Sequence, residues 1–292
     1  MTKEREGELF MLGVSVFESW FPILSIISLS AIGALHTYAF ALLISLFFFL
    51  FIIIKKNLFI ELKKTEVYKP LILTSFWITT LFVFIFIGMR YTTAGNVSVI
   101  IFLQLFFSYL YFNIFGKEKI DLLHTIGALA MGVGAIIVLF PDKLAFNKGD
   151  LLILTAAAIA PIANLYSQRA RKFCSSELIL GFRTFFALPV ISFLAWYFEA
   201  SLSLENIKIA LPYIFVIGLF IFGLSKIFWM EALHRISITK VSAMVALVPV
   251  LTLVFAYLFL NEIPQIRQLI GIFPILIGGY LLTKPTQQIK KF

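Results

Sequence analysis

The chain has 292 residues, of which 61% are hydrophobic and 13% are charged, and its mean hydropathy is +1.01. Soluble domains carry roughly 25% charged residues, so a water-soluble protein of this size would have too few charges to cover its surface. The composition excludes a cytoplasmic enzyme, a secreted disulfide scaffold and a disordered chain. It predicts a polytopic membrane protein. The single cysteine, Cys174, excludes an intramolecular disulfide.

Ten stretches of the chain are long and apolar enough to cross a bilayer, which takes about 20 residues of helix. In chain order the predicted spans are about 8–28, 32–54, 69–89, 94–115, 121–140, 150–169, 177–198, 209–230, 238–260 and 265–283. The first span does not resemble a cleaved signal peptide, because its N-terminal flank is of mixed charge and Glu18 interrupts its apolar stretch.

The lysines and arginines of the loops predict the orientation of these spans. Of the 24 basic residues, Arg183 and Lys226 fall within spans. With the N-terminus inside, 17 of the other 22 lie on the cytoplasmic side and 5 outside. We therefore expect both termini in the cytoplasm and the protein in a bacterial inner membrane. The net charge of +9 does not indicate a nucleic-acid partner, because the basic residues lie in short loops between apolar runs.

The two halves of the chain repeat each other. Each half opens on a similar tripeptide, which is Gly7-Glu8-Leu9 in the first half and Gly149-Asp150-Leu151 in the second. Each half also carries the spacing E-x8-G-x6-G. The motif consists of Glu118, Gly127 and Gly134 in the first half and of Glu262, Gly271 and Gly278 in the second. Because each half has five spans, the second half must be inverted relative to the first. The predicted fold is an all-α membrane protein with ten transmembrane helices in a 5+5 inverted repeat. Residues 1–141 and 142–292 form the halves of one integrated domain, a construction typical of secondary transporters.

These features resemble the EamA-type branch of the drug/metabolite transporter superfamily. The recurring E-x8-G-x6-G motif, the segment 243–262 with Pro249 at its centre and the segment 271–280 are similar to the family's most recognisable stretches. The resemblance implies solute transport, often export, through a central cavity formed by helices one to four and six to nine. Helices five and ten are expected to pack away from that cavity. Where the family often has an Arg in the second helix, this chain reads His36-Thr37-Tyr38.

Three ionisable residues within spans are candidates for transport. Glu18 lies near mid-depth, where an ionised carboxylate costs roughly 2.5–3.5 kcal/mol. It must be protonated, paired or exposed to a wet cavity, and a carboxyl raised in pKa by desolvation suits a proton carrier. Lys226 either meets an anionic group in the cavity or extends to the interface, where Glu231 is near in sequence. Arg183 is expected to be structural or interfacial, and less surely to meet a substrate carboxylate.

Other polar and aromatic residues complete the expected substrate- and proton-binding site. Amides within spans either join helices or contact a ligand, and aromatic rings either stack on an organic solute or face lipid and core. The candidates of this kind are Trp20, Tyr38, Gln104, Asn164 and Trp229.

We therefore expect a secondary active transporter of a small organic metabolite, such as an amino acid, that exports it by alternating access and couples it to protons. An uptake carrier or exchanger for an anionic or phosphorylated metabolite is the alternative. A membrane-embedded lipid-modifying enzyme and a channel are more remote. The sequence has no Walker loop and only three scattered histidines, so that no cofactor or metal is expected. The partners are the solute, protons and the bilayer, and the protein is a monomer or a homodimer.

Overall fold

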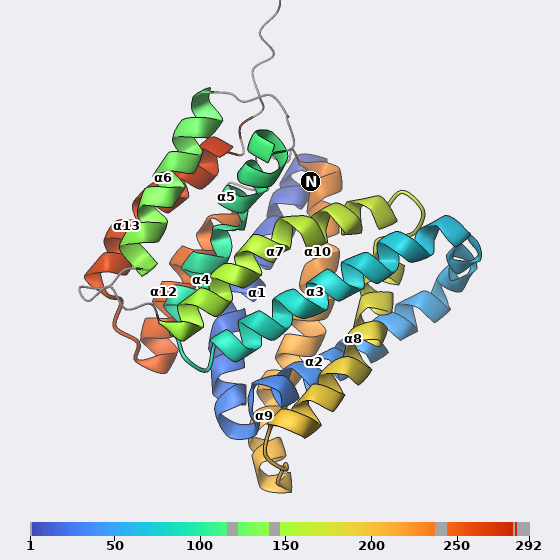
Figure 1. Ribbon diagram of the computed structural model, residues 1–292. Helices are drawn as coiled ribbons and strands as arrows, with labels where there is room; N and C mark the ends of the chain where they lie inside the picture. The colour runs from blue at the N-terminus through green and yellow to red at the C-terminus, as the bar shows by residue number, and fades with distance from the viewer. Residues whose placement is uncertain (1, 116–121, 140–146, 237–243, 283, 285–292) are drawn as a thin grey trace, which may run out of the picture.

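The computed structural model describes residues 2–115, 122–139, 147–236, 244–282 and 284, and every regular element in this part of the chain is a helix (Figure 1). This confirms the predicted fold class. The longer helices are α1 (Lys3–Ile32), α2 (Ala34–Lys55), α3 (Tyr68–Gly88), α4 (Ala94–Phe102), α6 (Leu122–Leu139), α7 (Lys148–Ala170), α8 (Ser176–Phe198), α9 (Leu204–Val216), α10 (Ser225–Arg235), α12 (Leu247–Leu260) and α13 (Ile266–Leu282). The shorter helical segments are η1 (Leu58–Lys63), η2 (Thr65–Val67), α5 (Gln104–Tyr109), η3 (Leu110–Phe115) and η4 (Ile217–Leu224).

These elements correspond to the ten predicted spans. Eight helical stretches are long and apolar enough to cross a membrane, and α12 and α13 are shorter apolar helices. The fourth span is divided into α4, α5 and η3, and the eighth into α9, η4 and α10. Residues 238–243 at the start of the ninth span, and Glu118 of the repeated motif, lie outside the described residues.

The glycines of the repeated motif pack against one another across the pair α6 and α13, which lie side by side in Figure 1. A Cβ atom on Gly134 would lie 2.6 Å from the Gly271 carbonyl oxygen, and one on Gly127 would lie 2.8 Å from the Gly278 carbonyl oxygen. Gly134 thus contacts Gly271, which is the repeat counterpart of Gly127, and Gly127 contacts Gly278, which is the counterpart of Gly134. A two-fold axis produces self-complementary contacts of this kind. An inverted repeat accounts for this crossing, and small residues permit the close approach of the two helices.

The same relationship holds between the first helix of each half and the third membrane-spanning helix of the other half. A Cβ atom on Gly7 of α1 would lie 2.8 Å from the Arg235 Cβ atom, at the end of α10. A Cβ atom on Gly149 of α7 would lie 2.7 Å from the Gly88 carbonyl oxygen and 2.9 Å from the Thr92 amide nitrogen, at the end of α3. The helix pairs α1–α10 and α7–α3 are therefore equivalent halves of one architecture.

Helices α2 and α8 are joined by carboxylates at both ends. Glu199, which follows α8, accepts hydrogen bonds from the first backbone amides of α2 at residues 34–36, with N···O distances of 2.7–3.1 Å. Glu61, which follows α2, accepts from the Ser175 amide nitrogen at 2.7 Å, directly before α8. Carboxylates satisfy the free amides of a helix N-terminus and interact favourably with its dipole. The two helices are thereby held together next to the cavity described below.

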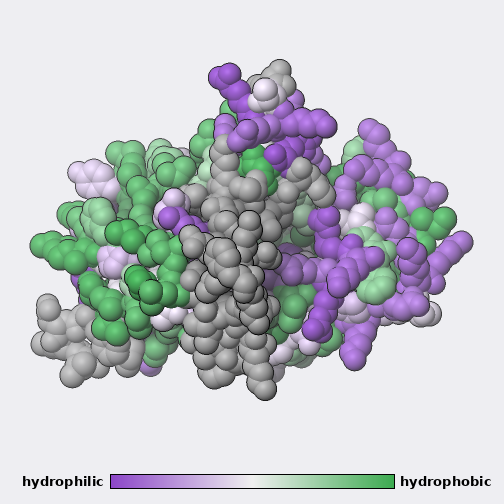
Figure 2. All heavy atoms as spheres, turned by 90° about the horizontal axis from the view of Figure 1, so that it is seen from above, coloured by the Kyte–Doolittle hydropathy of each residue, from purple (hydrophilic) through white to green (hydrophobic). Residues whose placement is uncertain are grey.

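Polar and apolar side chains are segregated on the surface of the molecule. Figure 2 shows hydrophilic side chains gathered at one side and hydrophobic side chains over the other. The hydrophilic side is where Figure 1 places the α2–α3 and α7–α8 connections, which carry the lysines and arginines of residues 55–69 and 169–172. Exposed apolar side chains lie along the helices, for example Phe51, Leu129, Trp196 and Phe273, as expected where lipid is the solvent.

Candidate functional site

A cavity lies between α2, α3, α8 and the η4–α10 segment. The resemblance predicted contributions from eight helices, and within the described residues four membrane-spanning segments line the cavity. Helices α6 and α13 do not line it, as expected. Its polar lining residues are Tyr38, Ser45, Thr79, Arg183, Thr184 and Lys226.

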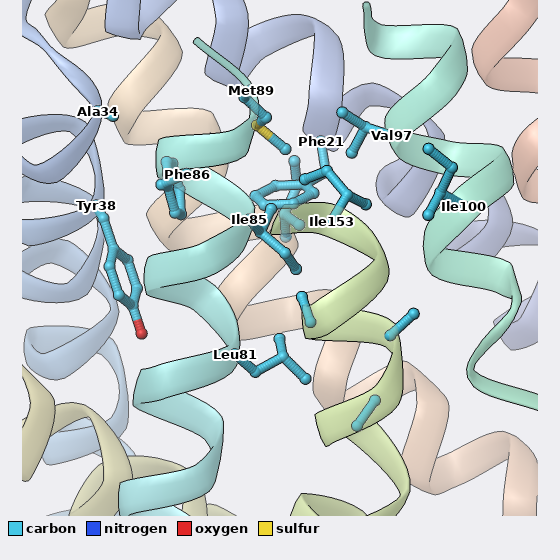
Figure 3. Packing of buried hydrophobic residues seen from close by; sticks show 14 of the residues in the cluster. Phe21, Ala34, Tyr38, Leu81, Ile85, Phe86, Met89, Val97, Ile100 and Ile153 are labelled. Carbon is cyan, nitrogen blue, oxygen red and sulfur yellow. The ribbon is translucent and has the colours of Figure 1, made fainter. Parts of the chain in front are cut away.

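Aromatic rings close the cavity toward the start of α2 and the end of α3. The Tyr38 ring stacks on that of Phe86 with the centroids 4.8 Å apart, and Phe82 and Phe222 pack edge-on at 5.1 Å. Figure 3 shows the Tyr38 ring extending from the level of Phe86 toward that of Leu81, with its hydroxyl pointing along α3. Tyr38, Phe82 and Phe222 thus form an aromatic part of the cavity lining.

Arg183 enters the cavity from α8. Its guanidinium forms no ion pair with a carboxylate of the described residues, and Tyr38 lines the same cavity. A guanidinium stays charged and presents donors suited to a carboxylate or phosphate. The cavity therefore contains a cation that no described carboxylate neutralises.

Two hydroxyl groups of the cavity also lack partners. Ser45 on α2 and Thr79 on α3 are buried, and neither the Ser45 Oγ atom nor the Thr79 Oγ1 atom has a hydrogen-bond partner within the described residues. Helical Ser and Thr commonly donate to the carbonyl four residues earlier, as Thr184 does to Leu180 at 2.8 Å. The two free hydroxyls face the same space as Arg183.

Glu18 and Lys226 form an ion pair beside the cavity. The Lys226 Nζ atom lies 2.6 Å from the Glu18 Oε1 atom, which also accepts from the Ser225 hydroxyl at 2.7 Å. Both charged side chains are about a quarter exposed. Lys226 lines the cavity, so the pair joins α1 of the first half to α10 of the second at its wall. The neighbouring carboxylate Glu231 binds Arg235 instead, as does Glu6 at 3.5 Å.

The backbone before Lys226 is unusual. Residues 217–224 form η4, a π-helical segment, a conformation that is rare and frequent at functional sites. Gly218 and Gly223 permit this segment to approach α2, since a Cβ atom on Gly218 would lie 2.7 Å from the Ala41 carbonyl oxygen. α10 begins directly after this segment, and its first two residues, Ser225 and Lys226, both donate to Glu18.

The remaining predicted site residues lie away from the cavity. Trp20 stacks on Phe255 of α12 with the centroids 4.8 Å apart, and Trp229 packs in the apolar cluster around Met11. Gln104 begins α5 and is half-buried, and Asn164 is exposed on α7. None of the four is among the residues that line the described cavity.

Sequence reasoning did not identify Ser45, Thr79, Thr184 and Ser225. Hydroxyl residues are frequent in apolar helices, and many of those in the described part of the chain donate to their own helix. Nothing in the sequence distinguishes the free hydroxyls from the bonded ones. Ser25 on α1 is a third buried hydroxyl without a partner in the described residues, and it does not line the cavity. The described residues contain no group of three or more side chains that could hold a metal ion.

Comparison with known proteins shows which family shares this architecture. A sequence profile described as the EamA-like transporter family matches the chain twice, over residues 5–140 and 147–284. The chain is 25% identical over 200 residues to the uncharacterized transporter YoaV of Bacillus subtilis (strain 168), covering 67% of this chain and 68% of that protein. It is 24% identical over 220 residues to an uncharacterized transporter of Archaeoglobus fulgidus, covering 72% and 74%. A solved crystal structure has the same fold with a TM-score of 0.71 over 99% of this chain and 100% of that one, at 14% identity.

Proposed function

The chain belongs to the EamA-like transporter family, and we propose that it is a secondary active transporter that exchanges a small organic metabolite for protons. Family membership makes it a multi-pass membrane transporter and not an enzyme. The proposed solute is an amino acid or a related metabolite, and the proposed mechanism is alternating access around the cavity between the two halves.

The observation that carries this proposal is the ion pair between Glu18 and Lys226. The carboxylate accepts a hydrogen bond from the ammonium, and it releases the ammonium when a proton or another cation takes its place. The ammonium group of an amino acid and a proton then compete for Glu18. Two ligands that compete for one site are carried in opposite directions by an alternating-access protein.

The direction of transport follows from this competition. The proton gradient across a bacterial inner membrane drives protons inward, so that proton–solute exchange moves the solute outward. We place the protein in that membrane with both termini in the cytoplasm, because 17 of the 22 loop cations then face inward. A monomer contains the complete ion pair and cavity, and a homodimer of such units is equally compatible with the proposal.

A second candidate function is uptake of an anionic or phosphorylated metabolite. It is favoured by the presence of Arg183 and Lys226 in the lining of one cavity. An anion binds Lys226 best when Glu18 is protonated, since the ammonium is then free. Proton and anion would therefore bind together and move in the same direction.

The sign of the proton coupling distinguishes the two candidates. Purified protein in detergent is titrated with each of the twenty amino acids and with small organic phosphates between pH 5 and 8, below the range in which α-amino groups deprotonate. Exchange predicts that the best ligand binds more weakly as the pH falls, because the proton competes for Glu18. Tighter binding of an anion at low pH would support the second candidate, and binding independent of pH would contradict both.

A further inference from the structure

The geometry points to a carboxylate-binding subsite formed by Arg183, Ser45 and Thr79, separate from the Glu18–Lys226 pair. This inference rests on the proposed function, and it names the part of the cavity that selects an acidic group. The three residues come from α8, α2 and α3 and line one cavity. Each has polar capacity that the described residues do not use.

The charge of the cavity favours a ligand that carries a carboxylate. Lys226 is neutralised by Glu18 at 2.6 Å, whereas Arg183 has no ion-pair partner among the described residues. An uncompensated cation between membrane helices is costly, and a bound carboxylate would remove that cost. The Arg183 guanidinium can donate two parallel hydrogen bonds to a carboxylate, which a lysine cannot.

The free hydroxyls complete the subsite. A buried hydroxyl without a hydrogen bond is unfavourable, and the Ser45 Oγ and Thr79 Oγ1 atoms are both in this state. A carboxylate has two oxygens and accepts about four hydrogen bonds. Two donors from Arg183 and one from each hydroxyl would supply that number. Thr184 lines the same cavity, but its hydroxyl already donates to the Leu180 carbonyl.

The assignment divides the recognition of an amino acid between two places. The subsite binds its carboxylate, and Glu18 binds its ammonium group in place of the Lys226 ammonium, which it holds in this structure. Tyr38, Phe82 and Phe222 line the same cavity, where they would contact an apolar side chain of the ligand. The subsite therefore determines specificity for the acid, and the ion pair determines the coupling to protons.

The test uses full-length protein in detergent and a panel of the twenty L-amino acids, followed by the primary amide of the best ligand. We expect Ser45→Ala and Thr79→Val each to weaken binding of the acid by about two- to tenfold, the loss expected for one neutral hydrogen bond. Arg183→Gln is expected to weaken it by roughly ten- to hundredfold, and Arg183→Lys to restore part of the loss. Binding of the amide should change by less than twofold in each hydroxyl variant.

The chain offers a matched control. Thr80→Val alters the adjacent hydroxyl, which donates to the Phe76 carbonyl and does not line the cavity. It should leave the affinity for the acid within about twofold. Because the hydroxyls of Ser45 and Thr79 have no described partner, their removal should leave the melting temperature of the ligand-free protein unchanged or raise it, so these variants remain informative if Arg183→Gln does not fold.

Several results would overturn the subsite. These are equal losses for acid and amide, a lower melting temperature of ligand-free Thr79→Val, or the absence of any acid that binds. Transport in proteoliposomes separates this failure from failure of the proposed function. If acids bind but an imposed pH gradient drives no solute, the exchange is wrong and the subsite stands. If a pH gradient drives transport of a solute whose affinity is unchanged by substitutions at Arg183, Ser45 and Thr79, the proposed exchange stands and the subsite is wrong.

Discussion

The Glu18 Oε1 atom of α1 lies 2.6 Å from the Lys226 Nζ atom of α10, so a carboxylate of the first half neutralises an ammonium of the second half at the wall of the cavity. The two residues are 208 positions apart in the chain. Any movement of one half against the other must therefore keep, break or replace this pair. That requirement makes the pair suitable for coupling proton binding to the exposure of the cavity.

The ion pair predicts non-additive effects on stability. Lys226→Met leaves the partly buried Glu18 carboxylate without its ammonium partner, and we expect a loss on the order of 1.5–3 kcal/mol in the free energy of unfolding. Adding Glu18→Gln should recover most of the loss, because no charge then remains unpaired. Unfolding in detergent measures both. Lys208→Met, at an exposed position of α9, is the control, and additive losses in the double variant would contradict the pairing.

The crossing of α6 and α13 predicts a difference between two glycines of one helix. Gly134→Ala would place a methyl group 2.6 Å from the Gly271 carbonyl oxygen, and we expect it to cost about 1–3 kcal/mol as overpacking. Gly132→Ala meets only the Phe106 ring at 3.8 Å and should be neutral or stabilising, since alanine favours helix. Comparable melting temperatures for the two variants would argue against the close crossing.

The carboxylate that joins α8 to α2 predicts a local loss of stability. Glu199→Ala removes the acceptor of the amides at residues 34–36, and we expect a cost of about 1–2 kcal/mol. Gly33 has a φ of 90° and lies against this carboxylate, so Gly33→Ala should also destabilise the protein. Hydrogen exchange should show faster opening at the start of α2. Glu205→Ala alters an exposed carboxylate, and an equal effect there would exclude a specific role for Glu199.

Cys174 predicts a pH dependence of chemical modification. Burial raises the pKa of this thiol to about 11, and only the thiolate is alkylated. At pH 8 the thiolate fraction is roughly a hundredfold lower than that of a thiol with a pKa near 9. Alkylation of the folded protein should be slow at pH 8, accelerate up to about pH 11 and become fast on unfolding. Rapid labelling at pH 8 without unfolding would contradict the buried environment.

The proposed orientation is tested by cysteines introduced at opposite ends of the bundle. In a Cys174→Ser background, Thr65→Cys lies in the basic α2–α3 connection and Ser201→Cys in the α8–α9 connection, and both native residues are exposed. We expect an impermeant thiol reagent added to intact cells to label position 201 and not position 65. The reverse pattern would place the termini outside.

Much of the architecture was predictable because it is encoded locally or by spacing. Apolar runs give the ten spans, and the 144-residue offset of Gly127 and Gly134 from Gly271 and Gly278 gives the inverted repeat that their contacts display. The division of the chain at residues 141 and 142 stays a prediction.

The arrangement of the site was less accessible from the sequence. Glu18 and Lys226 were separate candidates, because nothing in the sequence states which helices adjoin. Trp20 and Trp229 were plausible ligand contacts, and their rings pack against α12 and α1, since an aromatic ring on a helix gives no sign of the face that it occupies. The unpaired state of Ser45 and Thr79 depends on helix packing and is visible only in three dimensions.

The most direct test of proton exchange through Glu18 compares wild-type protein with Glu18→Gln in proteoliposomes loaded with the amino acid that binds best. The account predicts that a pH gradient accelerates release from wild-type vesicles, whereas Glu18→Gln continues solute–solute exchange and no longer responds to the gradient. Glu231→Gln, which alters the carboxylate bound to Arg235, should behave like the wild type. A gradient response in Glu18→Gln equal to that of the wild type would contradict the account.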